Sequence, residues 1–214
     1  KSEFLINSYI ESTQGNYDGG NIIQLKNGNI LIAWSSFEQD GSGYGVYGQL
    51  IDRGGTKLTD DFRINTFPYK DQNDPHVAPL NNGGFVVVWE SEDQDGYEYG
   101  IYGQRFNQKG VKLGDEFRIN TSVSGSQFDP SVSALNDGKF VVTWASEEQD
   151  GSGLGIFGQL FLQNGLRLGE EFQINSYSND DQDFSTVEIL IDSEPSLYEI
   201  VGVGHGILAD GATY

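Results

Sequence analysis

Cysteine and methionine are both absent from this sequence of 214 residues. Without cysteine there is no disulfide framework, no thiolate zinc site and no cysteine nucleophile. The sequence also lacks any apolar stretch near the roughly 20 residues that a membrane-spanning helix needs, so we expect no membrane span. It starts at Lys1 with neither an initiator methionine nor a signal-like segment, as in a processed or excerpted product.

Basic residues are scarce, because 12 Lys and Arg stand against 32 Asp and Glu, which gives a net charge of −20. Binding to nucleic acid requires clustered Lys and Arg, so nucleic acid is not an expected partner. The acidic balance is compatible with divalent cations, with high solubility or with an ordinary solvated surface. The missing cysteine and methionine are compatible with an oxidising exterior but do not establish one.

No segment shows sustained helical periodicity, whereas β-type signals recur throughout the sequence. The apolar runs "GFVVVW" (84–89) and "KFVVTW" (139–144) follow turn signals, and "GIYGQRF" (100–106) alternates with a period of two. The same pattern returns every 55 residues, most clearly at Trp34, Trp89, Trp144, Phe62, Phe117 and Phe172. Self-similarity at this period predicts a repeat architecture built only from strands.

Four strands in a unit of about 55 residues are typical of a β-propeller blade. We predict an all-β, four-bladed β-propeller that forms a single repeat domain over residues 1–214. The expected blades span 20–66, 75–121, 130–176 and 186–209, and the last is divergent because it lacks the tryptophan. The segment "FLINS" (4–8) is similar to the outer strand "FRINT" of later units, and we expect it to pair into the fourth blade and close the ring.

Two alternatives to a closed four-bladed ring remain open, namely part of a larger propeller and an open β-solenoid. A strand that closes its own ring can equally close the ring of a neighbour, which predicts strand-swapped or filamentous assembly between copies of the chain. The sequence does not choose between these two forms of closure.

An acidic, glycine-rich turn occurs in each of the first three units, as in "EQDG", "DQDG" and "EQDG". Calcium takes six to eight oxygen ligands, and these turns offer carboxylates for it. The metal ligands that we expect are Glu38, Asp40, Asp93, Asp95, Glu148 and Asp150. The EF-hand spacing is missing, however. The other interpretation is a connection between the second and third strands, in which Asp and Gly supply the backbone angles of a turn.

Other repeated residues have both a functional and a structural interpretation. The three tryptophans are predicted either to bind sugar rings by stacking or to pack between blades. The three glutamines after "YG" or "FG" are predicted either to line an axial channel or to bond the backbone of a neighbouring blade; they are Gln49, Gln104 and Gln159. Asn120 begins the single N-x-[ST] sequon and is the predicted glycosylation site.

Signals for catalysis are weak. The two histidines, His76 and His205, occupy non-equivalent positions, and the sequence contains neither G-x-S-x-G nor H-E-x-x-H. Acids that recur in every blade are poor candidates for the one asymmetric site that an enzyme needs. We therefore expect no enzymatic activity.

The motif string runs F-x-I-N-[TS], V-x-x-L, [FI]-[VL]-[VI]-x-W-x-S, Q-D-G-x-x-x-G-[IV]-[YF]-G-Q and G-x-[KR]-L. It resembles the tandem repeats of large secreted RTX-type adhesins and of protist and bacterial surface proteins, over residues 4–176 but poorly over 177–214. The resemblance implies propeller-like blades, an extracellular or cell-surface location, and a role in adhesion or surface structure. It brings no catalytic residue.

We therefore expect a non-enzymatic structural or adhesive module, such as the protomer of a fibril or surface layer. The alternative is a carbohydrate-binding β-propeller lectin. Calcium is the one cofactor expected. The expected partners are copies of the chain, other surface proteins, or glycans.

Overall fold

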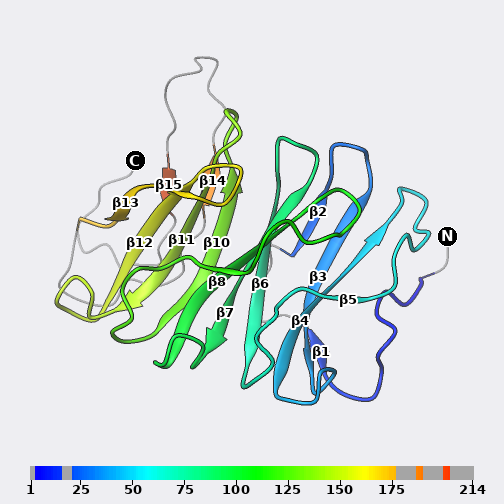
Figure 1. The fold of residues 1–214 in the computed structure, drawn as a ribbon, viewed down its shortest axis with the longest axis horizontal. Helices are drawn as coiled ribbons and strands as arrows, with labels where there is room; N and C mark the ends of the chain where they lie inside the picture. The colour runs from blue at the N-terminus through cyan, green and yellow to red at the C-terminus, as the bar shows by residue number, and fades with distance from the viewer. Residues whose placement is uncertain (1–2, 16–20, 177–186, 190–199, 203–214) are drawn as a thin grey trace, which may run out of the picture.

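The computed structural model describes residues 3–15, 21–176, 187–189 and 200–202, and the secondary structure within them consists of strands. Three antiparallel sheets of look-alike strands stand side by side, and a two-stranded sheet follows the third (Figure 1). The sheets resemble propeller blades, as the period of the repeat predicted. No helix capable of crossing a bilayer occurs in the part of the chain that the structure describes.

In the second and third sheets, strands that follow one another in the chain are neighbours, and in the first sheet both β1 and β2 pair with β3. The first sheet contains β1 (Gln14–Gly15), β2 (Ile22–Gln24), β3 (Ile30–Phe37), β4 (Tyr44–Ile51) and β5 (Phe62–Arg63). The second contains β6 (Gln72–Pro79), β7 (Phe85–Glu92), β8 (Tyr99–Phe106) and β9 (Phe117–Arg118). The third contains β10 (Gln127–Ala134), β11 (Phe140–Glu147), β12 (Leu154–Phe161) and β13 (Arg167–Gln173).

The first strand of one sheet packs across several strands of the preceding sheet, because β6 contacts β2, β3 and β4, and β10 contacts β6, β7 and β8. In the first sheet β1 and β2 share this position, because both pair with β3. β6 contacts β2 on one side and β10 on the other, and β10 in turn contacts β14 (Val187–Ile189). β14 therefore continues the row of first strands, and it pairs with β15 (Ile200–Gly202). The rest of the predicted blade over 186–209 lies outside the described residues.

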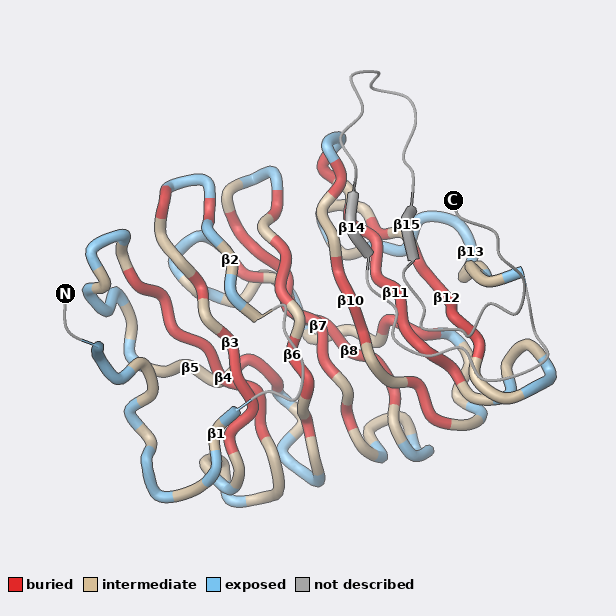
Figure 2. The backbone as a smooth tube through the Cα atoms, turned by 180° about the vertical axis from the view of Figure 1, so that it is seen from behind, coloured by how far each residue is buried: buried red, intermediate tan, exposed pale blue. Residues whose placement is uncertain are grey.

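Closure of a ring by residues 4–8 is not shown. This segment forms no strand, and Lys57 donates to the Ile6 carbonyl while Ser8 donates to Asp61, so both contacts run to the first blade. The amino-terminal segment lies at one end of the row of sheets and the β14–β15 pair lies toward the other (Figures 1 and 2). Closure within one chain stays a prediction.

The hydrophobic core lies between the sheets. Along β7, Val87 and Trp89 join the cluster shared with the first sheet, whereas Val86 and Val88 join the cluster shared with the third. All four are fully buried, because alternate residues of a strand point to opposite faces and both faces are covered here. Burial is concentrated on the long strands such as β7 and β11, and exposure is concentrated in the turns (Figure 2). The double-sided burial explains why "FVVVW" is apolar at every position.

An Asp-Pro pair interrupts the first strand of the second and third sheets. Proline has no amide hydrogen to donate, so within a sheet it is confined to edges and bulges. The pairing register shifts at both places. The aspartates, Asp74 and Asp129, have left-handed backbone φ angles of 50° and 51°. Such a bulge re-aims the side chain that it carries.

A buried amide pair joins the outer segment of each blade to the next sheet. Asn65 accepts a hydrogen bond from the Val46 N–H of its own blade at 2.9 Å. It also donates to Gln72 of the next sheet at 2.7 Å. Both amides are buried, so each bond replaces contact with water that neither group can make.

The same connection recurs at the next junction. Asn120 accepts from the Ile101 N–H at 2.9 Å and donates to Gln127 at 2.8 Å. At the amino terminus, Asn7 donates to Gln14 at 2.7 Å, again seven residues later in the chain. Equivalent amides therefore fix how successive units are placed against one another.

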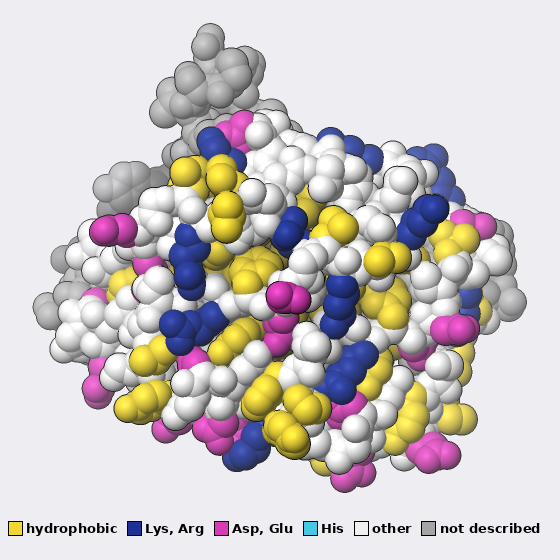
Figure 3. Space-filling model, in the orientation of Figure 1, with side chains coloured by type: hydrophobic (Ala, Val, Ile, Leu, Met, Phe, Trp, Pro, Cys, Tyr) yellow, Lys and Arg dark blue, Asp and Glu magenta, His cyan; other side chains and the backbone are white. Residues whose placement is uncertain are grey.

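Basic side chains also form hydrogen bonds across these junctions. Lys112 donates to the Asn65 carbonyl of the preceding blade at 3.4 Å, and Arg167 donates to the Asn120 carbonyl at 3.2 Å. Burial lowers the pKa of Lys112 and of Arg167 below their usual values. Lys and Arg side chains are spread over the face shown in Figure 3, although the chain as a whole is acidic.

Replacing Asn120 with Ala is expected to lower the free energy of unfolding by about 2–4 kcal/mol. The change leaves two buried groups without their partner, the backbone N–H of Ile101 and the side-chain amide oxygen of Gln127. Asn7→Ala is the matched control, and its expected cost is below about 1 kcal/mol because Asn7 is only partly buried. Urea unfolding measures both changes. Equal losses for the two variants would contradict the importance of burial at this junction.

Candidate functional site

The three repeated tryptophans lie in the core. Trp34 is 6% exposed, and Trp89 and Trp144 are fully buried. Trp89 packs between the first and second sheets, and Trp144 packs between the second and third. The predicted role in stacking against sugars is wrong, because no ring face is open to a ligand. Packing between blades, the structural interpretation, accounts for their positions.

The second acid of each "QDG" turn is engaged within its own blade. The carboxylate of Asp40 lies 2.6 Å from the Arg63 guanidinium. That of Asp95 lies 3.6 Å from Arg118. The side chains of both aspartates are almost completely buried, and the arginine supplies the opposite charge that a buried carboxylate requires.

An aromatic residue of the third strand lies beside this carboxylate. The pKa of Tyr47 is raised to about 12, first by burial and then by the neighbouring aspartate, and the pKa of Tyr102 is raised to about 12 in the same way. The third blade has Phe157 at this position, and Gln173 takes the place of the arginine and donates to Asp150 at 3.1 Å. The tyrosine and the arginine are thus replaced together.

The first acid of each turn shapes the backbone. Glu38, Asp93 and Glu148 have left-handed φ angles of 57°, 59° and 52°. The Glu38 N–H donates to the Gly43 carbonyl across the turn at 2.6 Å, and Asp93 forms an ion pair with Lys70 at 3.1 Å. These are the contacts of a tight connection, as the structural interpretation proposed.

The glutamine between the two acids links the turn to the junction with the preceding blade. Gln94 accepts from Ser91 at 2.7 Å and donates to one carboxylate oxygen of Glu116 at 2.6 Å. The other oxygen of Glu116 accepts from the Thr66 N–H and hydroxyl of the preceding unit. Gln149 and Glu171 repeat this contact in the third blade. The acidic turn is therefore part of the architecture.

The six predicted calcium ligands do not converge. None of them belongs to the one group of three or more His, Asp or Glu side chains, within the described residues, whose ligand atoms lie within 4.8 Å of one another. Asp40, Asp95 and Asp150 are engaged by side chains of their own blades. Cation binding by an individual turn stays a prediction.

The three repeated glutamines do not line an axial channel. Gln49, Gln104 and Gln159 lie on the third strands and are at most 1% exposed, so no open channel reaches them. Gln104 donates to the Gly114 carbonyl at 3.2 Å, in the segment leading to the outer strand of its own blade. The predicted channel role is wrong, and the amides instead hold the third strand to the outer segment.

Asn120 is not available as a glycosylation site in the folded chain. Its side chain is fully buried, and its amide nitrogen donates to the Ser122 carbonyl at 2.6 Å and to Gln127 at 2.8 Å. A glycan would occupy this nitrogen. The sequon is explained by the junction between blades, so the predicted glycosylation is wrong for the folded state.

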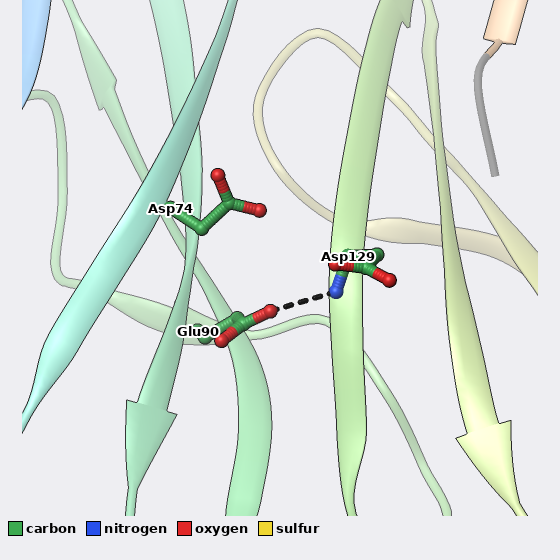
Figure 4. Close-up of side chains that lie close together, drawn as sticks. All are labelled: Asp74, Glu90 and Asp129. Carbon is green, nitrogen blue, oxygen red and sulfur yellow. Dashed lines mark hydrogen bonds between the residues drawn. The ribbon is translucent and has the colours of Figure 1, made fainter. Parts of the chain in front are cut away.

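The acids that do converge are Asp74, Glu90 and Asp129, which face one another in Figure 4. The two aspartates come from the bulges of β6 and β10, and Glu90 comes from β7, so two neighbouring sheets contribute. One carboxylate oxygen from each residue lies within 4.8 Å of the other two. Glu90 also accepts a hydrogen bond from the Asp129 N–H at 2.7 Å. Asp74 is 6% exposed.

These three carboxylates could hold a metal ion. Ionised carboxylates at such short separations repel one another, and the repulsion grows with burial because the dielectric constant falls. A cation between them converts this repulsion into attraction. Carboxylate oxygens are hard ligands, which suits calcium, magnesium or manganese better than thiophilic metals. His76 lies beside the group, with its Nε2 3.8 Å from an Asp74 oxygen.

Sequence reasoning missed this group because it looked for acids that recur. Asp74 and Asp129 are equivalent to each other, and each precedes a proline in the first strand. Glu90 follows the repeated tryptophan, where the other two blades have Ser35 and Ala145. A departure from the repeat at this one position is the signal that could have found the site.

No protein-family model and no curated protein matches the chain. The endo-arabinase of Bacteroides thetaiotaomicron superposes with a TM-score of 0.55 at 15% identity, covering 95% of this chain and 81% of that one. The α-L-arabinanase of Penicillium chrysogenum, complexed with arabinobiose, has a TM-score of 0.54 at 16% identity, covering 80% and 48%. A fucose lectin from Kordia zhangzhouensis aligns at 0.42 and 10% identity, over 75% of this chain and 100% of that one.

The similarity to the arabinanases places this chain among proteins with the β-propeller fold. The chain spans about half the length of the Penicillium enzyme. At these identities the likeness concerns the fold alone. The resemblance to the repeats of surface adhesins finds no matching family model and stays a prediction.

Adding an excess of Ca²⁺ or Mn²⁺ is expected to stabilise the protein through the acid group, by about 2.7 kcal/mol at a concentration 100 times the dissociation constant. Asp129→Asn keeps the size of the side chain but removes a charge, so it should abolish the response. Asp93→Asn, in an exposed turn, is the control and should retain it. Thermal melting with cation and with EDTA measures the effect. Stabilisation by the cation that is lost in Asp93→Asn but kept in Asp129→Asn would indicate that the cation binds in the acidic turn.

Proposed function

We propose that this chain is a non-enzymatic carbohydrate-binding β-propeller module whose site is the group Asp74, Glu90 and Asp129, with calcium as its cation. The observation that carries the proposal is the position of Glu90. It is the member of the group that has no acidic counterpart in the other two described blades, and it faces both aspartates. The residues that recur in each blade account for the sheets. Glu90 occurs in one blade and makes one place in the sheets chemically distinct.

Calcium connects the acid group to a sugar. The ion takes six to eight oxygen ligands at about 2.3–2.6 Å. Three carboxylates that each supply one oxygen leave at least three places in this shell for further ligands. Neighbouring hydroxyl groups of a sugar are neutral oxygen ligands with a suitable spacing, so a bound saccharide completes the coordination.

The similar solved structures support a role with carbohydrates. Two of them are arabinanases, one in complex with arabinobiose. The likeness supports a shared fold, and the acid group of this chain supports the binding of a cation. An extracellular or cell-surface location is part of the proposal, since soluble saccharides and cell-surface glycans are met there.

The arrangement of the acids supports the binding of a cation. One carboxylate oxygen from each of Asp74, Glu90 and Asp129 lies within 4.8 Å of the other two. Three converging carboxylate oxygens suit chelation of a hard cation, so the proposal assigns no catalytic residue.

Isothermal titration with an arabino-oligosaccharide and with methyl-fucoside tests the proposal, after a glycan array has ranked wider candidates. We expect sub-millimolar binding in calcium that is lost in EDTA, and loss of about tenfold or more in Glu90→Gln. Glu148→Gln is the control, because it removes an acid of the third acidic turn that is not part of the group, and it should bind as the parent chain does. Release of arabinose during prolonged incubation, or binding that is unchanged in Glu90→Gln, would contradict a calcium-dependent, non-enzymatic site.

A structural or adhesive role is the second candidate function. A specific observation favours it, because the first sheet presents an uncovered apolar face beside the amino-terminal segment. Ile22 on this face is 60% exposed, and Phe4 is 52% exposed. Sugar binding would use the junction of the second and third sheets, and self-association would use the first sheet, so the two functions are compatible.

A further inference from the structure

The second blade carries two exposed tyrosines that packing does not explain. In the part of the chain that the structure describes, Tyr69 and Tyr97 are the two tyrosines that are more than half exposed, at 65% and 57%. Single exposed apolar side chains are ordinary on a protein surface, whereas a group of them marks a site of interaction. The positions of these two rings therefore decide whether they have a role.

Both tyrosines depart from the repeat. Tyr69 lies four residues after the buried asparagine of its junction, and Tyr97 follows the glycine of its acidic turn. The residues at the same places in the other units are all polar, namely Glu11 and Ser124 for Tyr69, and Ser42 and Ser152 for Tyr97. The second blade also supplies Glu90, so the two tyrosines and this acid are three departures in one blade.

The two segments that carry these tyrosines are fastened to each other. Lys70 forms ion pairs with Glu92 and with Asp93, both at 3.1 Å. The Glu92 N–H donates to the Asp71 carbonyl at 2.8 Å. The segment leading into β6 and the turn between β7 and β8 thus lie at the same end of the second sheet (Figure 1).

The ring of Tyr69 is presented by a fixed segment. The Tyr69 carbonyl accepts a hydrogen bond from Gln72 at 2.7 Å. Two residues earlier, the Phe67 carbonyl accepts from Asn65 at 2.7 Å and from Arg63 at 2.9 Å. The ring of Phe67 meets that of Tyr69 edge to face, with centroids 5.6 Å apart. A ring held in this way loses little freedom when a ligand packs on it.

Tyr99 connects this end of the sheet with the acid group. It pairs with Glu92 across β7 and β8 and is partly buried. Burial raises the pKa of Tyr99, and carboxylates that include Glu92 and Glu90 raise it further. Glu90 precedes Glu92 by two residues on β7, which is about 7 Å along a strand. The exposed tyrosines and the acid group therefore lie at the same end of the second sheet.

We propose that Tyr69 and Tyr97 form an aromatic platform for a second sugar ring, so that the ligand of this chain is a neutral oligosaccharide. One unit binds the cation at the acid group, and another packs its C–H face on the platform. This inference rests on the proposed function and extends it from a monosaccharide to a longer chain.

The surroundings of the platform suit a neutral saccharide. Sugar rings combine C–H faces, which pack on aromatic rings, with hydroxyl groups that need hydrogen-bond partners. Lys70 and Asp93 lie beside the platform and offer a donor and an acceptor, with side chains 52% and 48% exposed. The net charge of −20 repels acidic glycans, so an uncharged saccharide is the favoured class.

Isothermal titration in calcium, with arabinose and with arabino-oligosaccharides of two to five units, tests the proposal. The glycan that ranks first on an array serves as a second probe. We expect affinity to rise with the number of units. Tyr69→Ser and Tyr97→Ser should each weaken oligosaccharide binding about three- to tenfold and leave monosaccharide binding unchanged. Serine stands at both positions in the third blade, so the fold tolerates it.

Two control variants separate the ring from other effects. Tyr69→Phe keeps the ring face and should bind as the parent chain does. Leu166→Ser removes an apolar side chain that is 62% exposed in the turn between β12 and β13, and it should also leave binding unchanged.

Thermal melting with calcium measures the acid group separately. Tyr69→Ser and Tyr97→Ser should keep the stabilisation by calcium, and its loss would overturn the proposal because the rings would then serve the fold. Oligosaccharide binding that Glu90→Gln abolishes and both serine variants leave unchanged overturns the platform but leaves the proposed function standing. Binding to no glycan overturns both. A polyproline peptide that binds in place of any saccharide, and less well to the serine variants, overturns the assignment to sugar.

Discussion

The stacking of one sheet on the next is the constraint on which the structure depends. Val86 and Val88 face one neighbour while Val87 and Trp89 face the other, so a blade on its own would expose at least one apolar surface. The burial of apolar surface between sheets stabilises the fold strongly, but it does not fix the orientation of one sheet against the next. The buried amide pairs and the carboxylate of Glu116 fix this orientation, because their hydrogen bonds are satisfied in one placement of the blades.

The same constraint explains why the acidic turn is repeated. Its glutamine and the carboxylate of the outer segment form a chain of bonds from the turn to the preceding blade. In the first blade the shorter Asp61 replaces Glu, and it accepts from Gln49 instead of the turn glutamine while still holding Ser8. The glutamine of the turn thus belongs to the connection between units, whereas the acids beside it shape the turn or pair within their own blade.

Chemistry distinct from architecture arises where the repeat is broken. The bulges give two equivalent aspartates on neighbouring first strands, and the stacking of the sheets brings them together. Glu90 then adds a third carboxylate at a position where the other blades have Ser or Ala. A repeat protein can in this way acquire one asymmetric site at the cost of a single substitution, while its cores and junctions stay intact.

The sequence by itself determined the strands, their order within each blade and the 55-residue unit, because alternation, turn residues and repetition are local properties of the chain. It also indicated that "FLINS" is an outer-type segment. Only the tertiary structure decided that the tryptophans, the repeated glutamines and Asn120 are buried, and that the acids meet at Asp74, Glu90 and Asp129. These outcomes depend on how neighbouring sheets stack and how a bulge turns a side chain, and spacing along the chain does not encode either.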